Sequence, residues 1–219
     1  MPISTIDPQM LKLVIASKKG GTGKTTLTGN MGVEADRSGA GPVAVIDTDE
    51  QGNLADWWNA RAAPTPHFAA VNVAQLGEQL PQLQRQGIRL AIIDTPAHEM
   101  PIIQAACAVA DFVLIPARPS PHDIRSIGVV VEMVEHIKKP FCFVVNGATP
   151  RSIIVQEAVA SLAEHGKVAP VVIHNRVDFA ASMTDGRTVG ELAPASRSAQ
   201  EIIALWKYVL TQLRKYANS

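Results

Sequence analysis

Residues 11–26 read LKLVIASKKGGTGKTT and carry the strongest structural signal in the chain. The apolar, branched run over residues 11–16 predicts a buried strand. Closely spaced glycines follow, then Lys24, Thr25 and Thr26, and then a helix is predicted through Arg37. A strand, a glycine-rich turn and a helix in this order predict a phosphate-binding loop. The glycines let backbone N–H groups approach phosphate oxygens, and the helix N-terminus adds its positive dipole end.

Two side chains of this loop carry specific chemistry. Lys24 is placed to reach the β- and γ-phosphates of a nucleotide, and the Thr25 hydroxyl is placed to hold a magnesium ion. A glycine-rich turn with a chance lysine is the alternative interpretation. The predicted strand and helix on either side favour the phosphate loop.

The segment KGGTGKTT also has an early lysine, Lys19, and resembles the deviant Walker A motif K-G-G-x-G-K-T of the ParA/MinD family of ATPases. The resemblance implies that ATP binds with Mg²⁺ and that Lys19 and Lys24 take part in hydrolysis. In that family the early lysine reaches the nucleotide of a partner subunit, which implies an ATP-dependent homodimer. The loop residues implied to bind ATP are Lys19, Gly20, Gly21, Thr22, Gly23, Lys24, Thr25 and Thr26.

The length and composition suit one α/β domain. The chain has 219 residues, 47% of them hydrophobic, and no apolar run approaches the roughly 20 residues that span a bilayer. Seven strands are predicted, beginning near residues 11, 43, 68, 90, 111, 141 and 168. We therefore expect a mostly parallel, twisted sheet with helices on both faces, in a single ParA-like ATPase domain over residues 1–219.

Two acidic motifs follow predicted strands. DTDEQGN, residues 47–53, resembles the family segment D-x-D-P-Q-G-N, with Glu50 in place of proline. The resemblance implies that Asp49 orients the attacking water and the metal shell. RLAIIDTPAHE resembles the family's Walker B motif, which implies that Asp94 binds magnesium, although Ala97 departs from the frequent second proline. Carboxyl ends of parallel strands are where open α/β sheets place ligand chemistry.

Two further segments resemble family motifs near the site. The loop PARPSPHD resembles V-P-x-x-P-S, so Arg118, Ser120 and Asp123 either contact a partner subunit or belong to a rigid proline connector. Asn146 ends a predicted strand, where the family places an asparagine that binds adenine. From the residues alone, Asn146 reads equally as a turn residue.

The charge distribution gives a weak argument for DNA. Residues 1–137 hold 10 Lys and Arg against 14 Asp and Glu, a net charge of −4, and residues 138–219 hold 10 against 6, a net charge of +4. The stretch after the last strand resembles the C-terminal region of Soj-like ParA proteins, which bind DNA without sequence preference. Arg176 and Arg197 match the basic positions there, and Arg187 lies between them.

These observations predict a positioning or partition ATPase that binds nonspecific double-stranded DNA and is stimulated by a ParB-like or adaptor protein. The first ten residues lack the pattern of a signal peptide, so we expect a cytoplasmic, nucleoid-associated protein. They are also too few for the N-terminal helix-turn-helix domain of larger plasmid ParA proteins. A membrane-surface ATPase of the MinD type is the alternative. The apolar stripe of the last helix favours core packing over membrane binding.

Other relatives on this fold fit less well. The nitrogenase iron protein needs a cluster-ligating cysteine just after its Walker B aspartate, and Cys107 and Cys142 do not occupy that place. A dethiobiotin-synthetase-like ligase needs a small-substrate pocket. A bacterial tyrosine kinase usually carries a C-terminal tyrosine cluster, whereas Tyr208 and Tyr216 are the only tyrosines here.

Overall fold

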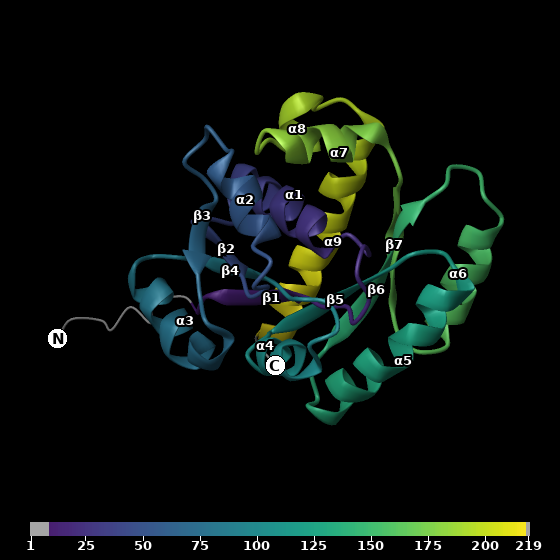
Figure 1. Ribbon diagram of the computed structural model, residues 1–219, viewed down its shortest axis with the longest axis horizontal. Coiled ribbons are helices and arrows are strands. Elements are labelled where there is room, and N and C mark those ends of the chain that lie inside the picture. The colour runs from purple at the N-terminus through teal and green to yellow at the C-terminus, as the bar shows by residue number, and fades with distance from the viewer. Residues whose placement is uncertain (1–8, 218–219) are drawn as a thin grey trace.

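The computed structural model describes residues 9–217 and contains a seven-stranded sheet of order β3-β2-β4-β1-β5-β6-β7 (Figure 1). Every strand pair is parallel. The strands are β1 (Leu11–Ile15), β2 (Val43–Asp47), β3 (His67–Ala70), β4 (Leu90–Asp94), β5 (Phe112–Ala117), β6 (Phe141–Ala148) and β7 (Val168–His174). This architecture confirms the predicted fold class. The expectation about a signal peptide concerns residues 1–10, most of which lie outside the described range.

The helices form one layer on each face of the sheet. In the view of Figure 1, the elements α1, α2, α7 and α8 lie above the sheet, α3, α4 and α5 lie below it, and α9 packs into the same apolar cluster as α1. The helices are α1 (Lys24–Arg37), α2 (Asn53–Asn59), α3 (Leu76–Arg85), α4 (Met100–Ala108), α5 (Pro121–His136), α6 (Ile154–Ala163), α7 (Val177–Thr184), α8 (Val189–Leu192) and α9 (Arg197–Ala217), with a 3₁₀ turn, η1 (Val73–Gln75).

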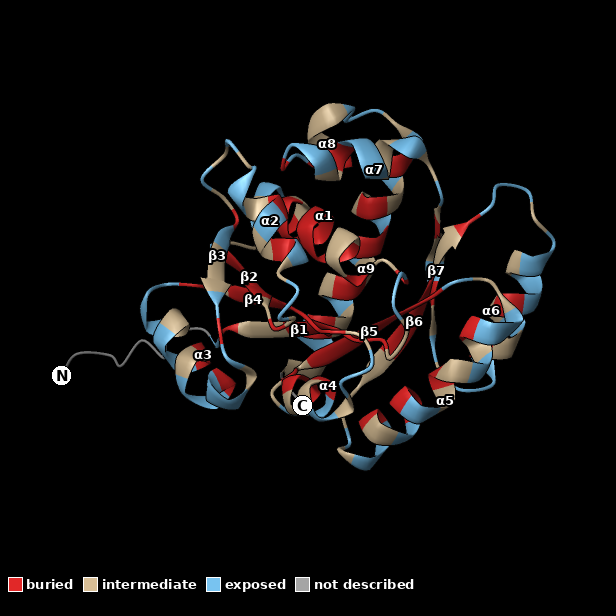
Figure 2. Cartoon of the chain, viewed as in Figure 1, coloured by how far each residue is buried: buried red, intermediate tan, exposed pale blue. Residues whose placement is uncertain are grey.

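The central strands of the sheet are the most completely buried part of the molecule (Figure 2), whereas the edge strands β3 and β7 are partly exposed. The strand side chains alternate between two apolar clusters on opposite faces of the sheet. One cluster is covered by α3, α4, α5 and α6, and the other by α1, α8 and α9. Cys107 and Cys142 are fully buried, one in each cluster, and burial raises the pKa of each thiol to about 12. Both cysteines therefore act as small core hydrophobes, as predicted.

The last helix packs its apolar stripe into the core. Along α9 the large side chains at i, i+3, i+4, i+7 and i+11 are at most 3% exposed, and the Trp206 indole N–H donates to Ser38 Oγ at 2.8 Å. Full burial of one such side chain stabilises a fold by about 1.5–3 kcal/mol. The stripe comprises Ile202, Leu205, Trp206, Val209 and Leu213. Core packing is thus confirmed for this stripe, and within residues 9–217 no helix is long and apolar enough to cross a membrane.

The third strand is shorter than the sequence predicts. The segment FAAVNV predicts a strand over residues 68–73, but β3 ends at Ala70. The Asn72 side chain accepts a hydrogen bond from the N–H of Ala74 at 2.9 Å and caps the 3₁₀ turn η1. This local capping competes with strand pairing, which is the usual effect of asparagine near its own backbone.

A buried polar clamp joins Arg61, just after α2, to α8 and to the segment before it. The Arg61 side chain, only 3% exposed, makes two hydrogen bonds to the Glu191 carboxylate, at 2.6 and 2.9 Å. Arg61 also donates to the carbonyl oxygens of Gly186 and Thr65 at 2.6 and 2.7 Å. Beside it, the Trp57 indole donates to the Arg187 carbonyl at 3.1 Å. The clamp holds residues 186–191 against α2.

Removing Arg61 should therefore destabilise the fold. We expect Arg61→Ala to lower the free energy of unfolding by about 3 kcal/mol, because Glu191 and the two carbonyl groups lose their buried partner. Urea unfolding measures the change. Arg187→Ala is the matched control, since its ion pair with Asp185 joins side chains that are 53% and 47% exposed. Equal unfolding midpoints for the two variants would contradict the assignment.

Candidate phosphate and metal site

The phosphate loop connects β1 to α1 at the carboxyl edge of the sheet, as predicted. Gly23 caps α1 in a left-handed conformation, with φ of 90°, and the Asn146 amide occupies the place that a Cβ at this position would need. Glycine is required there both by the backbone and by the space. The Asn146 Nδ2 donates to the Thr22 carbonyl at 2.6 Å, so this asparagine buttresses the loop.

The loop lysine is buried at the base of the site. Lys24 is 7% exposed, and its ammonium donates to the Lys19 carbonyl at 3.4 Å. Burial lowers the pKa of Lys24, and the opposing charges of Asp94 and Asp49 counteract that effect. A desolvated ammonium facing a phosphate loop is a strong partner for an anion.

Asp94 and Thr25 form an oxygen pair suited to a divalent cation. The Thr25 hydroxyl donates to Asp94 Oδ2 at 2.6 Å, while the buried Asp94 Oδ1 has no hydrogen-bond partner within the described residues. Burial raises the pKa of Asp94 to about 7, against the hydrogen bond from Thr25. No group of three or more His, Cys, Asp or Glu in residues 9–217 could hold a metal. Mg²⁺ instead commonly uses one or two carboxylates plus substrate phosphates, which these residues fit.

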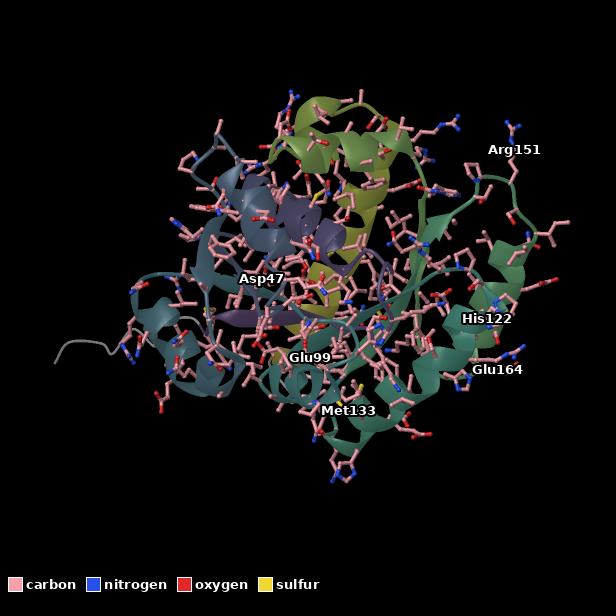
Figure 3. All side chains as sticks on the ribbon, viewed as in Figure 1. Asp47, Glu99, His122, Met133, Arg151 and Glu164 are labelled. Atoms are coloured by element: carbon pink, nitrogen blue, oxygen red, sulfur yellow. The ribbon has the colours of Figure 1, made fainter. Side chains whose placement is uncertain are left out.

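The two aspartates of the DTD motif have different surroundings. Asp47 lies opposite Asp94 in the register of β2 and β4, near the centre of the molecule below α2 (Figure 3). Its carboxylate accepts from the N–H groups of Asp49, Leu54 and Ala55 at 3.0–3.2 Å and so caps the start of α2. Asp49 lines the cavity beside Lys24, and among residues 9–217 its side chain accepts only a local bond, from the Gln51 N–H at 3.0 Å. Asp47 is thus committed to structure, and Asp49 faces the cavity.

Lys19 forms an ion pair within its own chain. Its ammonium lies 2.9 Å from Asp123 Oδ2, at the start of α5. Asp123 is 7% exposed at its side chain and accepts a bond from the Ser120 hydroxyl, and its buried Oδ1 has no partner in the part of the chain that the structure describes. The proline-rich loop therefore supplies a counter-charge to the phosphate loop within one chain.

A cavity of about 620 Å³ opens beside the phosphate loop. It brings together the predicted residues Lys24, Thr25 and Asp49, whereas Lys19, Asp94 and Asn146 do not line it. Arg118, predicted from the sequence only as a candidate partner contact, also lines the cavity. The walls that sequence reasoning missed come from α2 with its flanking residues and from α7, namely Gln51, Asn53, Asp56, Trp57, Ala60, Met183 and Thr184. Nothing in the spacing of residues 183 and 184 marks them as site residues, because only the fold brings α7 over α2.

Comparison with known proteins identifies the family. Residues 13–189 match the family described as the CobQ/CobB/MinD/ParA nucleotide binding domain. The chain belongs to this family. The expected resemblance to ParA and MinD proteins is thereby confirmed.

Sequence alignments with individual relatives extend over nearly the whole of this ParA/MinD-type chain. The maintenance of carboxysome distribution protein A of Halothiobacillus neapolitanus is 28% identical over 200 residues, which span 87% of this chain and 92% of the relative. The chromosome-partitioning ATPase Soj of Thermus thermophilus is 23% identical, with 93% of this chain and 97% of Soj covered.

Solved structures share the fold. Apo McdA from Cyanothece superposes with a TM-score of 0.76 at 20% identity, covering 92% of this chain and 100% of that one. MinD from Pyrococcus horikoshii, solved with Mg-ADP, gives a TM-score of 0.76 at 18% identity, covering 92% of this chain and 96% of MinD. These likenesses establish the α/β P-loop NTPase architecture of the ParA/MinD-type chain.

The three arginines predicted to bind DNA lie near α7, α8 and the start of α9. Arg176 pairs with Glu201 at 2.6 Å, and Glu201 also binds His174 at 2.8 Å. Arg187 pairs with the exposed Asp185, also at 2.6 Å. Arg197 begins α9 and is exposed. Two of the three guanidinium groups therefore already form ion pairs with carboxylates of the same ParA/MinD-type chain.

The raised pKa of Asp94 predicts that the folding stability of the nucleotide-free protein decreases as the pH rises. Its folded pKa of about 7 exceeds the ordinary value of 3.8. The stability it contributes is therefore present below about pH 4 and lost as the pH rises through 7. We expect Asp94→Asn to raise the thermal midpoint by several degrees at pH 8 and by less at pH 5. Differential scanning fluorimetry measures both.

Asp56→Asn, which removes an exposed carboxylate from the cavity wall, is the matched control and should change the midpoint little at either pH. If Asp94 holds Mg²⁺, added Mg²⁺ and ATP should stabilise the parent more than Asp94→Asn, since the carboxylate charge that would hold the metal is gone. A gain for Asp94→Asn that is as large at pH 5 as at pH 8 would show that Asp94 titrates normally.

Proposed function

We propose that this chain is a Mg²⁺-dependent ATPase with a deviant Walker A loop, and that it positions or partitions a cargo. The proposal is carried by Lys24 and Thr25 at the start of α1 together with Asp94, which ends β4 and is bonded to the Thr25 hydroxyl at the carboxyl edge of the sheet. Family membership supports nucleotide binding, and the names of Soj, ParA and the carboxysome-distribution relative support a positioning role.

The site residues divide the chemistry between them. Residues 20–26 would bind the phosphates through backbone N–H groups and the α1 dipole, and Lys24 would neutralise their charge. Thr25 and Asp94 would hold Mg²⁺, which supplies charge stabilisation to the transferred phosphoryl group. Asp49 has an accepting oxygen facing the cavity and would orient the attacking water.

ATP-dependent homodimerisation is the second part of the proposal. For Lys19 to reach a partner's nucleotide it must leave Asp123, 2.9 Å away in its own chain. A phosphate would then replace a carboxylate as the lysine's counter-ion, and hydrolysis would remove charge that helps hold the subunits together. Asn146 remains a candidate for adenine binding, in addition to its bond to Thr22.

The proposed dimer binds nonspecific double-stranded DNA and is stimulated by a ParB-like or adaptor protein, in a cytoplasmic, nucleoid-associated setting. Arg176, Arg187 and Arg197 gather on one side of the molecule, on and between β7, α7, α8 and α9. One copy has little free positive charge there, so two copies joined by ATP would bind more strongly. The buried stripe of α9 argues against its use as a membrane anchor of the MinD type.

The phosphate loop provides the direct test. Lys24→Ala should weaken ATP binding by roughly two orders of magnitude, because the phosphates lose a charged, desolvated donor. Calorimetric titration with ATP and Mg²⁺ measures the affinity. Lys207→Ala on α9, which removes an exposed lysine, is the matched control and should bind ATP like the parent. An unchanged affinity of Lys24→Ala would remove the basis of the proposal.

The DNA surface has a separate test. Arg187→Glu combined with Arg197→Glu should greatly weaken ATP-dependent binding to random duplex DNA, and binding by the parent should fall steeply as salt rises. Arg176 is left intact because reversing it would disturb the Glu201 pair. Gel retardation at matched salt and saturating ATP gives the measurement.

Arg85→Glu combined with Lys138→Glu is the charge-matched control, since both residues are exposed, Arg85 at the end of α3 and Lys138 just after α5, and these helices lie on the opposite face of the sheet. Equal retardation by both double variants would place the DNA surface elsewhere. If the parent ignores DNA and binds anionic liposomes, the chain is a membrane-surface ATPase.

A further inference from the structure

Two cations of the described chain line the cavity beside the phosphate loop: Lys24 and Arg118. Lys19 belongs to the loop, but its ammonium is held by Asp123. A nucleoside triphosphate at neutral pH carries more negative charge than one lysine neutralises. The position of Arg118 therefore bears directly on how a single chain would bind such a ligand.

The fold delivers Arg118 to the phosphate loop. Strand β5 ends at Ala117 and pairs with β1, with Leu114 opposite Ile15, so the next residue emerges beside the loop that follows β1. A Cβ at Gly21 would lie 3.8 Å from Arg118 Nη2, and a Cβ at Gly147 would lie 3.8 Å from Arg118 Cγ and Nε. The side chain thus extends from the end of β6 to the phosphate loop.

The guanidinium of Arg118 is available to a ligand. Arg118 is exposed, and no ion pair or side-chain hydrogen bond holds its guanidinium within residues 9–217. Arg176, Arg187 and Arg61 contrast with it, since each is paired with a carboxylate. An unpaired arginine at the rim of a phosphate loop is suited to an anion, because its planar fork matches phosphate oxygens.

The sheet order places Arg118 opposite the metal-binding oxygens. Strand β1 lies between β4 and β5. Asp94 ends β4 on one side of the phosphate loop, and Arg118 follows β5 on the other. A phosphate chain on the loop would therefore have the Thr25–Asp94 oxygen pair on one side and the guanidinium on the other.

We propose that Arg118 binds the terminal phosphate of the nucleoside triphosphate within its own chain. The proposal rests on the proposed nucleotide-binding function and names a second phosphate-binding cation for the same site. Lys24 grips the phosphates from the base of the loop, and Arg118 closes over them from the β5 side. Lys19 stays paired with Asp123 in the single chain, so the second cation comes from Arg118.

Nucleotide titrations of Arg118→Ala and Arg118→Lys test this assignment. They use a non-hydrolysable ATP analogue and ADP, with Mg²⁺, at a protein concentration where light scattering shows a monomer. Arg118→Ala should bind the ATP analogue at least about tenfold more weakly, as expected for a lost charged hydrogen bond. ADP affinity should change less than about threefold, since ADP lacks the terminal phosphate.

Arg118→Lys should fall between the parent and Arg118→Ala for the ATP analogue, because charge is kept and the bidentate fork is lost. Arg125→Ala on α5 is the matched control: it removes an exposed arginine from the following helix and should bind both nucleotides like the parent. Thermal midpoints within a degree or two of the parent's would exclude a folding defect as the cause.

Three results would overturn the assignment. Equal weakening of ATP-analogue and ADP binding would place Arg118 on another part of the nucleotide. Unchanged monomer binding with loss of only the ATP-dependent dimer would make Arg118 a contact to a partner subunit. Unchanged binding and dimerisation would make it a bystander. Failure of the parent to bind either nucleotide would instead contradict the proposed function itself.

Discussion

The buried charges of Lys24 and Asp94 are the constraint on which the site depends. Lys24 is 7% exposed and Asp94 is 1% exposed, so both are largely removed from water. Desolvation disfavours the charged form of each group, and one oxygen of Asp94 has no partner among residues 9–217. Natural folds accept such a cost mainly where a ligand offsets it, which is why these two residues mark the functional edge of the sheet.

The surrounding structure holds this edge in place through short, specific contacts. Asn146 occupies the space beside Gly23 and bonds to the loop, and Asp47 caps α2 from the end of β2. Just after the other end of α2, Arg61 holds α8 through Glu191 and the segment before α8 through the Gly186 carbonyl. A seven-residue helix therefore joins the acidic edge of the site to the segment that carries Arg187. Because Asp47 bonds the start of α2 and Arg61, just after its end, bonds α8 and the segment before it, a shift of α2 at the site would also displace the segment that carries Arg187.

The cations around the site have distinct surroundings. Lys24 lies at the base of the loop, Lys19 is held aside by Asp123, and Arg118 reaches the loop from the β5 side. Under our proposals, a single chain would bind the triphosphate with Lys24 and Arg118 and would keep Lys19 for the nucleotide of a partner. Exchange of Asp123 for phosphate at Lys19 would then accompany dimerisation.

Local sequence was sufficient to place the seven strands and the phosphate loop and to predict the parallel sheet, because apolar runs, glycine spacing and helix starts are short-range properties. It also identified Asp94 and Thr25, which the structure joins at 2.6 Å. It did not predict that Lys19 pairs with Asp123, that Asn146 buttresses the loop, or that α7 contributes Met183 and Thr184 to the cavity wall. The Arg61–Glu191 clamp joins residues 130 positions apart. Such pairings depend on strand order and helix packing, which bring distant segments together, so they follow from the folded chain alone.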